Sequence, residues 1–159
     1  MHTTVHFSNI KSEIIGNLKK ATREIKVAIA WLTDEDIIRT LTQKAESGLN
    51  VQIVMSESRE NYRNTSKFKD FLRFGGKLHI AAPKFLHNKF CIIDGNTIIN
   101  GSYNWTYFAQ GNDENILIIT LDSNVQEDNK LLTAFDAKHK FFCEKASMHV
   151  TDISELNRF

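Results

Sequence analysis

The chain has 159 residues, 42% of them hydrophobic and 25% charged, with a formal net charge of +1 at pH 7. This composition is typical of a globular protein in water, and the length suits a single domain, residues 1–159, with a sizeable hydrophobic core. So small a net charge does not by itself indicate a protein that binds nucleic acid. The longest apolar runs, such as residues 27–32, are far shorter than the roughly 20 residues of a membrane span, so we expect no stable association with a membrane.

Apolar residues recur along the chain at helical and strand spacings in turn. Ile10, Ile14 and Leu18 form the stripe of a helix, whereas Val51 and Ile53 alternate with polar residues as in a strand. In chain order the predicted elements are a helix capped by Ser8, a strand over 25–32, a helix from Asp34 to Gly48, a strand over 49–55, a loop over 56–64, a helix from Thr65 or Ser66 to Gly75, a strand over 77–82, a hairpin over 87–100, a short helix over 104–110, a strand over 115–121 and a helix over 124–143. This order predicts an α/β fold with a mixed β-sheet flanked by helices on both faces, and it leaves residues 146–159 unassigned.

The N-terminal segment, residues 1–7, lacks the basic start and apolar core of a secretory signal, so we expect a cytoplasmic protein. Cys91 and Cys143 have neither metal-ligand nor redox spacing, and in a reducing compartment we expect them to remain thiols. Cys91 is interpreted as a packing residue. Since no group of His, Cys, Asp or Glu residues has the spacing of a closed metal site, we expect no metal and no other cofactor.

A histidine and a lysine two residues apart precede a turn in the predicted hairpin. Successive side chains of a strand point to opposite faces, so His87 and Lys89 are expected to project together. An imidazole attacks phosphorus or transfers a proton, and a neighbouring ammonium neutralises a phosphate oxygen. The residues Asp94, Gly95 and Asn96 are typical of a two-residue hairpin turn, and the Asp94 side chain either caps this turn or supports the site. The hairpin therefore predicts a site for a phosphodiester.

The second strand of the hairpin is followed by small and uncharged polar residues, which are expected to lie beside His87 and Lys89. Gly101 is expected to let the backbone approach a ligand closely, and the Ser102 hydroxyl and Asn104 amide are donors suited to phosphate oxygens. Glu114, before the next strand, is expected to accept a proton from the ring nitrogen of His87 that does not react. Such a carboxylate fixes the tautomer and orientation of an imidazole.

These spacings resemble the signature of the phospholipase D superfamily. The matching pattern is His87-x-Lys89, four residues, Asp94, six residues, and Gly101-Ser102-x-Asn104. The segment with Glu114 resembles that family's histidine-orienting glutamate. The resemblance implies a two-step displacement at phosphorus through a phosphohistidine, with no metal.

The chain carries one copy of the motif, whereas larger enzymes of that superfamily carry two. None of the other histidines has a lysine two residues further on. The resemblance therefore implies a homodimer whose two-fold axis brings two His87 and two Lys89 side chains into one site. The resemblance implies that one imidazole attacks phosphorus and that the other protonates the leaving oxygen and then activates water.

The segment before the hairpin has a local excess of positive charge. Eight basic residues lie between Arg59 and Lys89, against the two acidic residues Glu60 and Asp70. Aromatic residues are interleaved with them, a composition that suits nucleic acid. The alternative is a solvated helix face with its aromatic residues in the core. The residues predicted to contact nucleic acid are Arg59, Arg63, Lys67 and Lys84.

The sequence favours a metal-independent endonuclease acting on DNA or RNA. The resemblance leaves a phospholipid hydrolase, such as one acting on cardiolipin, as the main alternative. A module that binds nucleic acid without cleaving it is a further alternative, although such a module has no need of His87 or its orienting glutamate.

Overall fold

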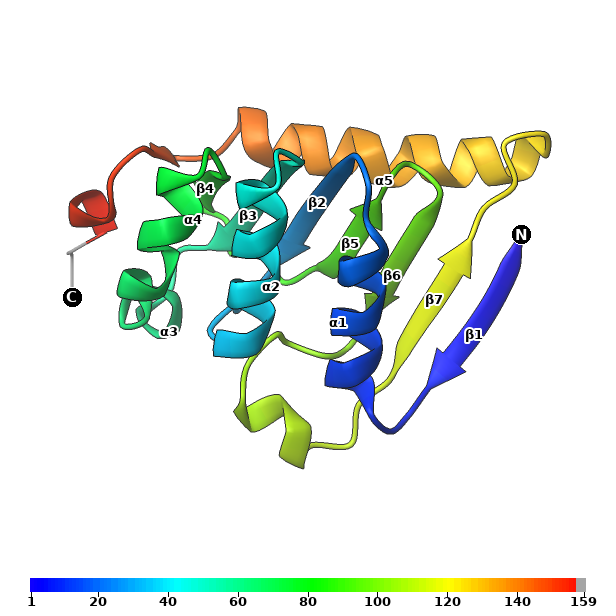
Figure 1. Ribbon diagram of the computed structural model, residues 1–159, viewed down its shortest axis with the longest axis horizontal. Helices are drawn as coiled ribbons and strands as arrows, with labels where there is room; N and C mark the ends of the chain where they lie inside the picture. Colours follow the sequence, from blue (N-terminus) through cyan, green and yellow to red (C-terminus); the bar gives the residue numbers. More distant parts are fainter. Residues whose placement is uncertain (157–159) are drawn as a thin grey trace.

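A computed structural model describes residues 1–156, which form one eight-stranded sheet with helices on both faces (Figure 1). The strands are β1 (His2–His6), β2 (Glu24–Ile29), β3 (Asn50–Ser56), β4 (Lys77–Ala81), β5 (Lys89–Ile93), β6 (Thr97–Gly101), β7 (Ile116–Thr120) and β8 (Met148–Val150). The helices are α1 (Ile10–Lys20), α2 (Glu35–Glu46), α3 (Arg59–Tyr62), α4 (Lys69–Arg73) and α5 (Gln126–Glu144), with 3₁₀ turns η1 (Thr65–Phe68), η2 (Phe108–Gly111) and η3 (Ile153–Leu156). The predicted mixed α/β architecture is confirmed.

The strand order is β1-β7-β6-β5-β2-β3-β4-β8. Strands β2, β3 and β4 run parallel, and all other neighbouring pairs are antiparallel. In this register Ile29, at the end of β2, pairs with Lys89, and Gly101, at the end of β6, pairs with Ile116. We call the edge formed by these four residues the motif edge. It lies toward the bottom of the view in Figure 1.

The two faces of the sheet bury separate sets of apolar side chains. Helices α1, α2 and α4 cover one face, where Val27 and Cys91 are fully buried, as predicted for Cys91. Helix α5 covers the other face, where Ala28 and Phe90 are buried. This division follows from the strand period of two. Trp105, after β6, joins the first core.

Several local predictions are wrong. Ser8 does not cap α1, because Asn9 occupies the N-cap position in the left-handed region, with φ of 53° and no side-chain cap bond. The expected loop over 56–64 contains α3, because the Ser58 hydroxyl accepts a hydrogen bond from the Asn61 N–H at 3.2 Å. The expected third helix is divided into η1 and α4, since the backbone at Phe68 has ψ near 0° and tightens the first turn.

Both ends of the chain add strands that were not predicted. β1 pairs with β7 and β8 pairs with β4, each in the antiparallel sense. β1 is almost wholly exposed, so its sequence lacks the apolar alternation that signals a strand. Residues 157–159 of the unassigned tail lie outside the described residues.

Asp94 ties the hairpin turn to the start of β2. Its carboxylate accepts hydrogen bonds from the backbone N–H groups of Thr22 (2.9 Å), Arg23 (2.8 Å) and Glu24 (3.0 Å), and from the Thr22 hydroxyl (3.0 Å). Burial alone would raise the pKa of Asp94, but these hydrogen bonds outweigh it and hold the pKa below its ordinary value. The turn has three residues rather than the expected two, because Ile93 pairs with Thr97.

Removing the Asp94 carboxylate should destabilise the fold in a pH-dependent way. We expect Asp94→Ala to lower the free energy of unfolding by about 3 kcal/mol at neutral pH, because three partly buried backbone donors lose their acceptor together. The folded pKa lies below the unfolded value of about 3.9, so the stabilisation is present above that value and is lost as the pH falls through the folded pKa. Urea unfolding across this range measures the effect.

The exposed carboxylate of Asp113 offers a matched control, and Asp113→Ala should be nearly neutral. A stability gap between wild type and Asp94→Ala that stays constant down to strongly acidic pH would contradict this account.

Candidate active site

His87 and Lys89 meet at the motif edge. Lys89 is the first residue of β5, and His87 lies two residues before the strand, on an exposed segment. The Lys89 ammonium donates a hydrogen bond to the backbone oxygen of His87 at 2.7 Å. The Ala30 N–H donates to the backbone oxygen of Asn88 at 3.0 Å and so ties this segment to the end of β2. The two predicted residues are therefore brought together, with the lysine held by the backbone of the histidine.

The electrostatics of Lys89 link it to Glu114. Partial burial lowers the pKa of Lys89 below its ordinary value, and attraction to the Glu114 carboxylate opposes part of this shift. No hydrogen bond joins Glu114 to His87 within residues 1–156. Instead Glu114 Oε1 accepts a long hydrogen bond of 3.5 Å from the Asn112 amide. The role of Glu114 in orienting His87 stays a prediction.

Ser102 and Asn104 keep donors available after their structural hydrogen bonds are made. The Ser102 hydroxyl accepts from the Asn115 N–H at 3.1 Å, which leaves its own hydrogen to donate. Asn104 Oδ1 accepts from the Trp31 N–H at 3.3 Å, which leaves its amide N–H groups to donate. Both residues follow β6 at the motif edge, as predicted.

Gly101 and Asp94 make close contacts with neighbouring strands. A Cβ atom at Gly101 would lie 2.1 Å from the backbone oxygen of Asn115 and 2.8 Å from Ile116 Cα. The close approach that the structure shows at Gly101 is to β7, and the expected approach to a ligand stays a prediction. Asp94 lies at the far end of β5, five residues from Lys89, so at about 3.3 Å per residue it is too distant to contact the same phosphate.

The four predicted nucleic-acid contacts occupy different surroundings. Arg63 lines a cavity that Asn104 also lines. The Lys67 ammonium donates to the backbone oxygen of Thr33 at 2.8 Å and is partly buried. Arg59 and Lys84 are exposed.

The interpretation of the aromatic residues as core is confirmed at two positions. Phe68 and Phe71 are fully buried and pack edge to face. They therefore have no face available to nucleic acid.

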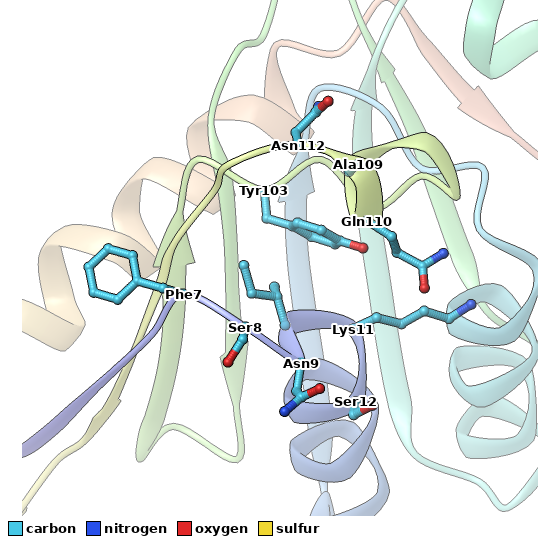
Figure 2. Close-up of a pocket in the computed structure, with 10 residues that line it drawn as sticks. Phe7, Ser8, Asn9, Lys11, Ser12, Tyr103, Ala109, Gln110 and Asn112 are labelled. Atoms are coloured by element: carbon cyan, nitrogen blue, oxygen red, sulfur yellow. The ribbon is translucent and has the colours of Figure 1, made fainter.

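Two cavities flank the segment that follows Asn104, and the sequence predicted neither. We call the first the Tyr103 cavity; its volume is about 270 Å³, and Figure 2 shows the Tyr103 hydroxyl, the Gln110 amide and Lys11 lying on the same side of it. Within the described chain the Tyr103 hydroxyl is buried and has no hydrogen-bond partner, and burial raises its pKa to about 12. The Lys11 ammonium forms ion pairs with Asp34 at 2.9 Å and Asp36 at 2.7 Å.

We call the second the Phe108 cavity; its volume is about 320 Å³ and its lining includes Trp31, Arg63, Asn104 and Phe108. It shares Ala109 and Asn112 with the Tyr103 cavity. The residues that line these two cavities lie far apart in the sequence. For this reason no pattern of residue spacing could predict the cavities.

Residues 1–156 contain no cluster of three or more His, Cys, Asp or Glu side chains that could hold a metal ion. In the same range no helix is long and apolar enough to cross a membrane.

Adding one methyl group at Gly101 should force β6 and β7 apart and so destabilise the fold next to the candidate site. We expect Gly101→Ala to lower the free energy of unfolding by about 2–3 kcal/mol, because β6 and β7 must separate to admit the Cβ atom. Gly111→Ala is the matched control, since a Cβ atom there meets no atom within 4 Å. Thermal unfolding of both variants checks this, and equal melting temperatures would refute the close approach.

The link between Glu114 and Lys89 is also testable. We expect the pKa of Lys89 to fall further in Glu114→Gln, because the attraction that opposes the burial effect is removed. An NMR titration of the Lys89 side chain measures the shift, with Glu127→Gln on α5 as the control. An unchanged pKa of Lys89 in Glu114→Gln would show that the two groups do not interact.

Comparison with known proteins places this arrangement in a family. Residues 14–136 match the family model described as "Cardiolipin synthase, PLD-like domain". A protein named mitochondrial cardiolipin hydrolase, from Chlamydomonas reinhardtii, is 28% identical over 134 residues, which cover 82% of this chain and 56% of that protein. The chain therefore spans little more than half the length of that relative.

Two solved structures share the fold. The phospholipase D family member Nuc from Salmonella typhimurium superposes with a TM-score of 0.80 at 21% identity, over 94% of this chain and 97% of that one. NucT from Helicobacter pylori gives a TM-score of 0.74 at 21% identity, over 91% and 97% of the two chains. Together with the family match over most of the chain, the motif at the sheet edge shows that this chain belongs to the phospholipase D-like family.

Proposed function

We propose that the chain is a metal-independent phosphodiesterase that cleaves DNA or RNA endonucleolytically. The observation that carries the proposal is that His87, whose backbone oxygen binds the Lys89 ammonium, and the free donors of Ser102 and Asn104 all lie at the motif edge. A nucleophile, a cation and neutral donors are the groups that displacement at a phosphodiester requires.

The proposed reaction has two displacements. In the first, a ring nitrogen of His87 attacks phosphorus, so that a P–N bond forms while the P–O bond to the leaving group breaks. His87 of a second copy donates a proton to the leaving oxygen. In the second step that imidazole takes a proton from water, and the water oxygen attacks phosphorus and breaks the P–N bond. Lys89, Ser102 and Asn104 stabilise the charge on the non-bridging oxygens.

A homodimer would supply the second imidazole. The chain has a single copy of the motif, and His87 is exposed and therefore accessible to a partner. A two-fold axis through the motif edge would bring two such imidazoles together. Two positive charges close together repel, so this arrangement favours one neutral and one protonated ring, as the reaction needs.

Nucleic acid is the favoured substrate because exposed basic residues lie near Asn104 and shortly before His87 in the chain. Arg63 lines the same cavity as Asn104, and Lys84 precedes His87 on an exposed segment. Several such cations can bind the phosphates on either side of the scissile one.

A cardiolipin-type phospholipid is the second candidate substrate. The observation in its favour is that the Chlamydomonas relative bears the name mitochondrial cardiolipin hydrolase. Both substrates present a phosphodiester to the same groups, so the reaction proposed for His87 is common to them. Parallel assays with oligonucleotides and cardiolipin vesicles separate the two candidates.

Loss of the imidazole should abolish turnover. We expect His87→Ala to reduce the cleavage of labelled single- and double-stranded oligonucleotides by more than about 10⁴-fold in excess EDTA, because both the nucleophile and the acid–base group are lost. His2→Ala, at an exposed position of β1, is the matched control and should cleave normally. Wild-type turnover by a folded His87→Ala protein would contradict the proposed role of His87. If the wild-type protein hydrolysed cardiolipin but not oligonucleotides, the substrate would be a phospholipid rather than nucleic acid.

The shared site can be tested by mixing subunits. After exchange between equal amounts of wild type and His87→Ala, random pairing leaves about a quarter of the dimers with two intact imidazoles. We therefore expect activity to fall to about a quarter of that of the same total amount of wild type. Activity near one half would mean that each chain works alone. Sedimentation of the wild-type protein as a monomer would lead to the same conclusion.

A further inference from the structure

Two aromatic rings stand exposed at the motif edge, close to Asn104. Phe108 is 84% exposed and Tyr107 is 71% exposed, and their rings meet edge to face with centroids 6.1 Å apart. The Thr106 hydroxyl accepts a hydrogen bond from the Ala109 N–H at 3.2 Å, which fixes the turn that presents them. Burying a phenylalanine side chain is worth about 1.5–3 kcal/mol, so an ordered turn that leaves one in water indicates a binding surface.

The Phe108 cavity connects this surface to the reactive groups. Phe108 and Trp31 supply aromatic walls, and Asn104 and Arg63 supply polar donors. Its volume of about 320 Å³ is near the lower end of the range of about 300–1,000 Å³ for small-molecule sites. A cavity with this size and lining suits one planar polar group rather than a long chain.

We propose that the Phe108 cavity holds one unpaired nucleobase of the substrate, beside the scissile phosphate at Asn104. This inference rests on the proposed nuclease function. The base stacks on the Phe108 ring, which accepts any base because every base has a π face. Arg63 then contacts a neighbouring phosphate. A base can enter the cavity only after it leaves its own helix, so the substrate is single-stranded at the position of cleavage.

The lining combines apolar walls, which supply most of its area, with a polar border. The polar groups of Glu60, Asn64 and Thr33 belong to this border, and they would lose water without compensation if a hydrocarbon covered them. A base instead offers donors and acceptors along its edge, which can replace those water contacts. The cavity lining therefore complements a heterocycle next to a phosphate.

The test is a double-mutant cycle between the protein and the oligonucleotide. Binding is measured by fluorescence anisotropy in the catalytically inactive His87→Ala background, with a short single-stranded oligonucleotide and with versions carrying one abasic nucleotide at each position in turn. We expect one position at which the abasic change weakens binding about tenfold, and we expect this loss to disappear when Phe108→Ala is added. Additive losses at every position would overturn the proposal.

Control variants keep the result interpretable. Phe141 is an exposed phenylalanine on α5, far from the motif in sequence, and Phe141→Ala should leave the abasic effect intact. Phe108→Leu retains apolar volume without an aromatic face and should behave like Phe108→Ala. A fully paired duplex of the same sequence should bind more weakly than the single strand, and equal affinity would count against the proposal.

Failure of this inference can be distinguished from failure of the proposed function. Oligonucleotide cleavage without the Phe108 coupling would overturn the base site alone. No binding or cleavage of any oligonucleotide would overturn both. Loss of cardiolipin vesicle binding in Phe108→Ala, or its dissociation to a monomer in sedimentation, would assign the ring to a lipid or to a second copy and would also overturn the base site.

Discussion

Close packing of β6 against β7 at Gly101 fixes where the motif residues Ser102 and Asn104 lie. The backbone oxygen of Asn115 occupies the space that a Cβ atom would need, so the two strands meet without any side chain between them. One residue further on, Ser102 pairs with Asn115 through both its N–H and its hydroxyl. The chain then continues to Asn104, whose amide oxygen accepts from Trp31 beyond β2. The donors of the motif are thus held by the sheet rather than by a flexible loop.

Hydrogen bonds to Asp94 hold the opposite end of the hairpin in place. Asp94 accepts four hydrogen bonds from Thr22, Arg23 and Glu24, which fix β5 against β2. This register places Lys89 beside Ile29 at the motif edge. The Asp94 carboxylate therefore helps to determine where the Lys89 ammonium lies, although the two residues stand at opposite ends of β5.

Charge at the motif edge is balanced rather than simply positive. Partial burial disfavours the charged form of Lys89, and Glu114 partly restores it. An ammonium that is incompletely solvated interacts more strongly with a phosphate oxygen than one in bulk water. At the Tyr103 cavity, the ion pairs of Lys11 with Asp34 and Asp36 neutralise the Lys11 ammonium. At the Phe108 cavity, Arg63 and Glu60 contribute charges of opposite sign to the lining.

The sequence predicted what depends on local spacing and missed what depends on contacts across the chain. The placement of His87, Lys89, Ser102 and Asn104 near one another follows from the strand period and from one hairpin. The contacts of Gly101 with β7 and of Asp94 with the start of β2 depend on strand pairing, which no local spacing predicts.

The cavities were unpredictable for a related reason. Trp31, Arg63 and Phe108 line one cavity although they belong to three separate segments of the chain. β1 was missed because its exposed side chains carry no apolar period, and it is held by backbone pairing with β7. The family resemblance located the motif residues, whereas the surface around them required the three-dimensional structure.

The stereochemical course at phosphorus tests the central claim most directly. A single-stranded oligonucleotide with one phosphorothioate linkage of known configuration is hydrolysed in water enriched in oxygen-18, and the configuration of the product is determined. Each in-line displacement inverts phosphorus, so two displacements through His87 predict overall retention. Inversion would mean that water attacks the diester in a single step, and it would contradict the covalent role assigned to His87.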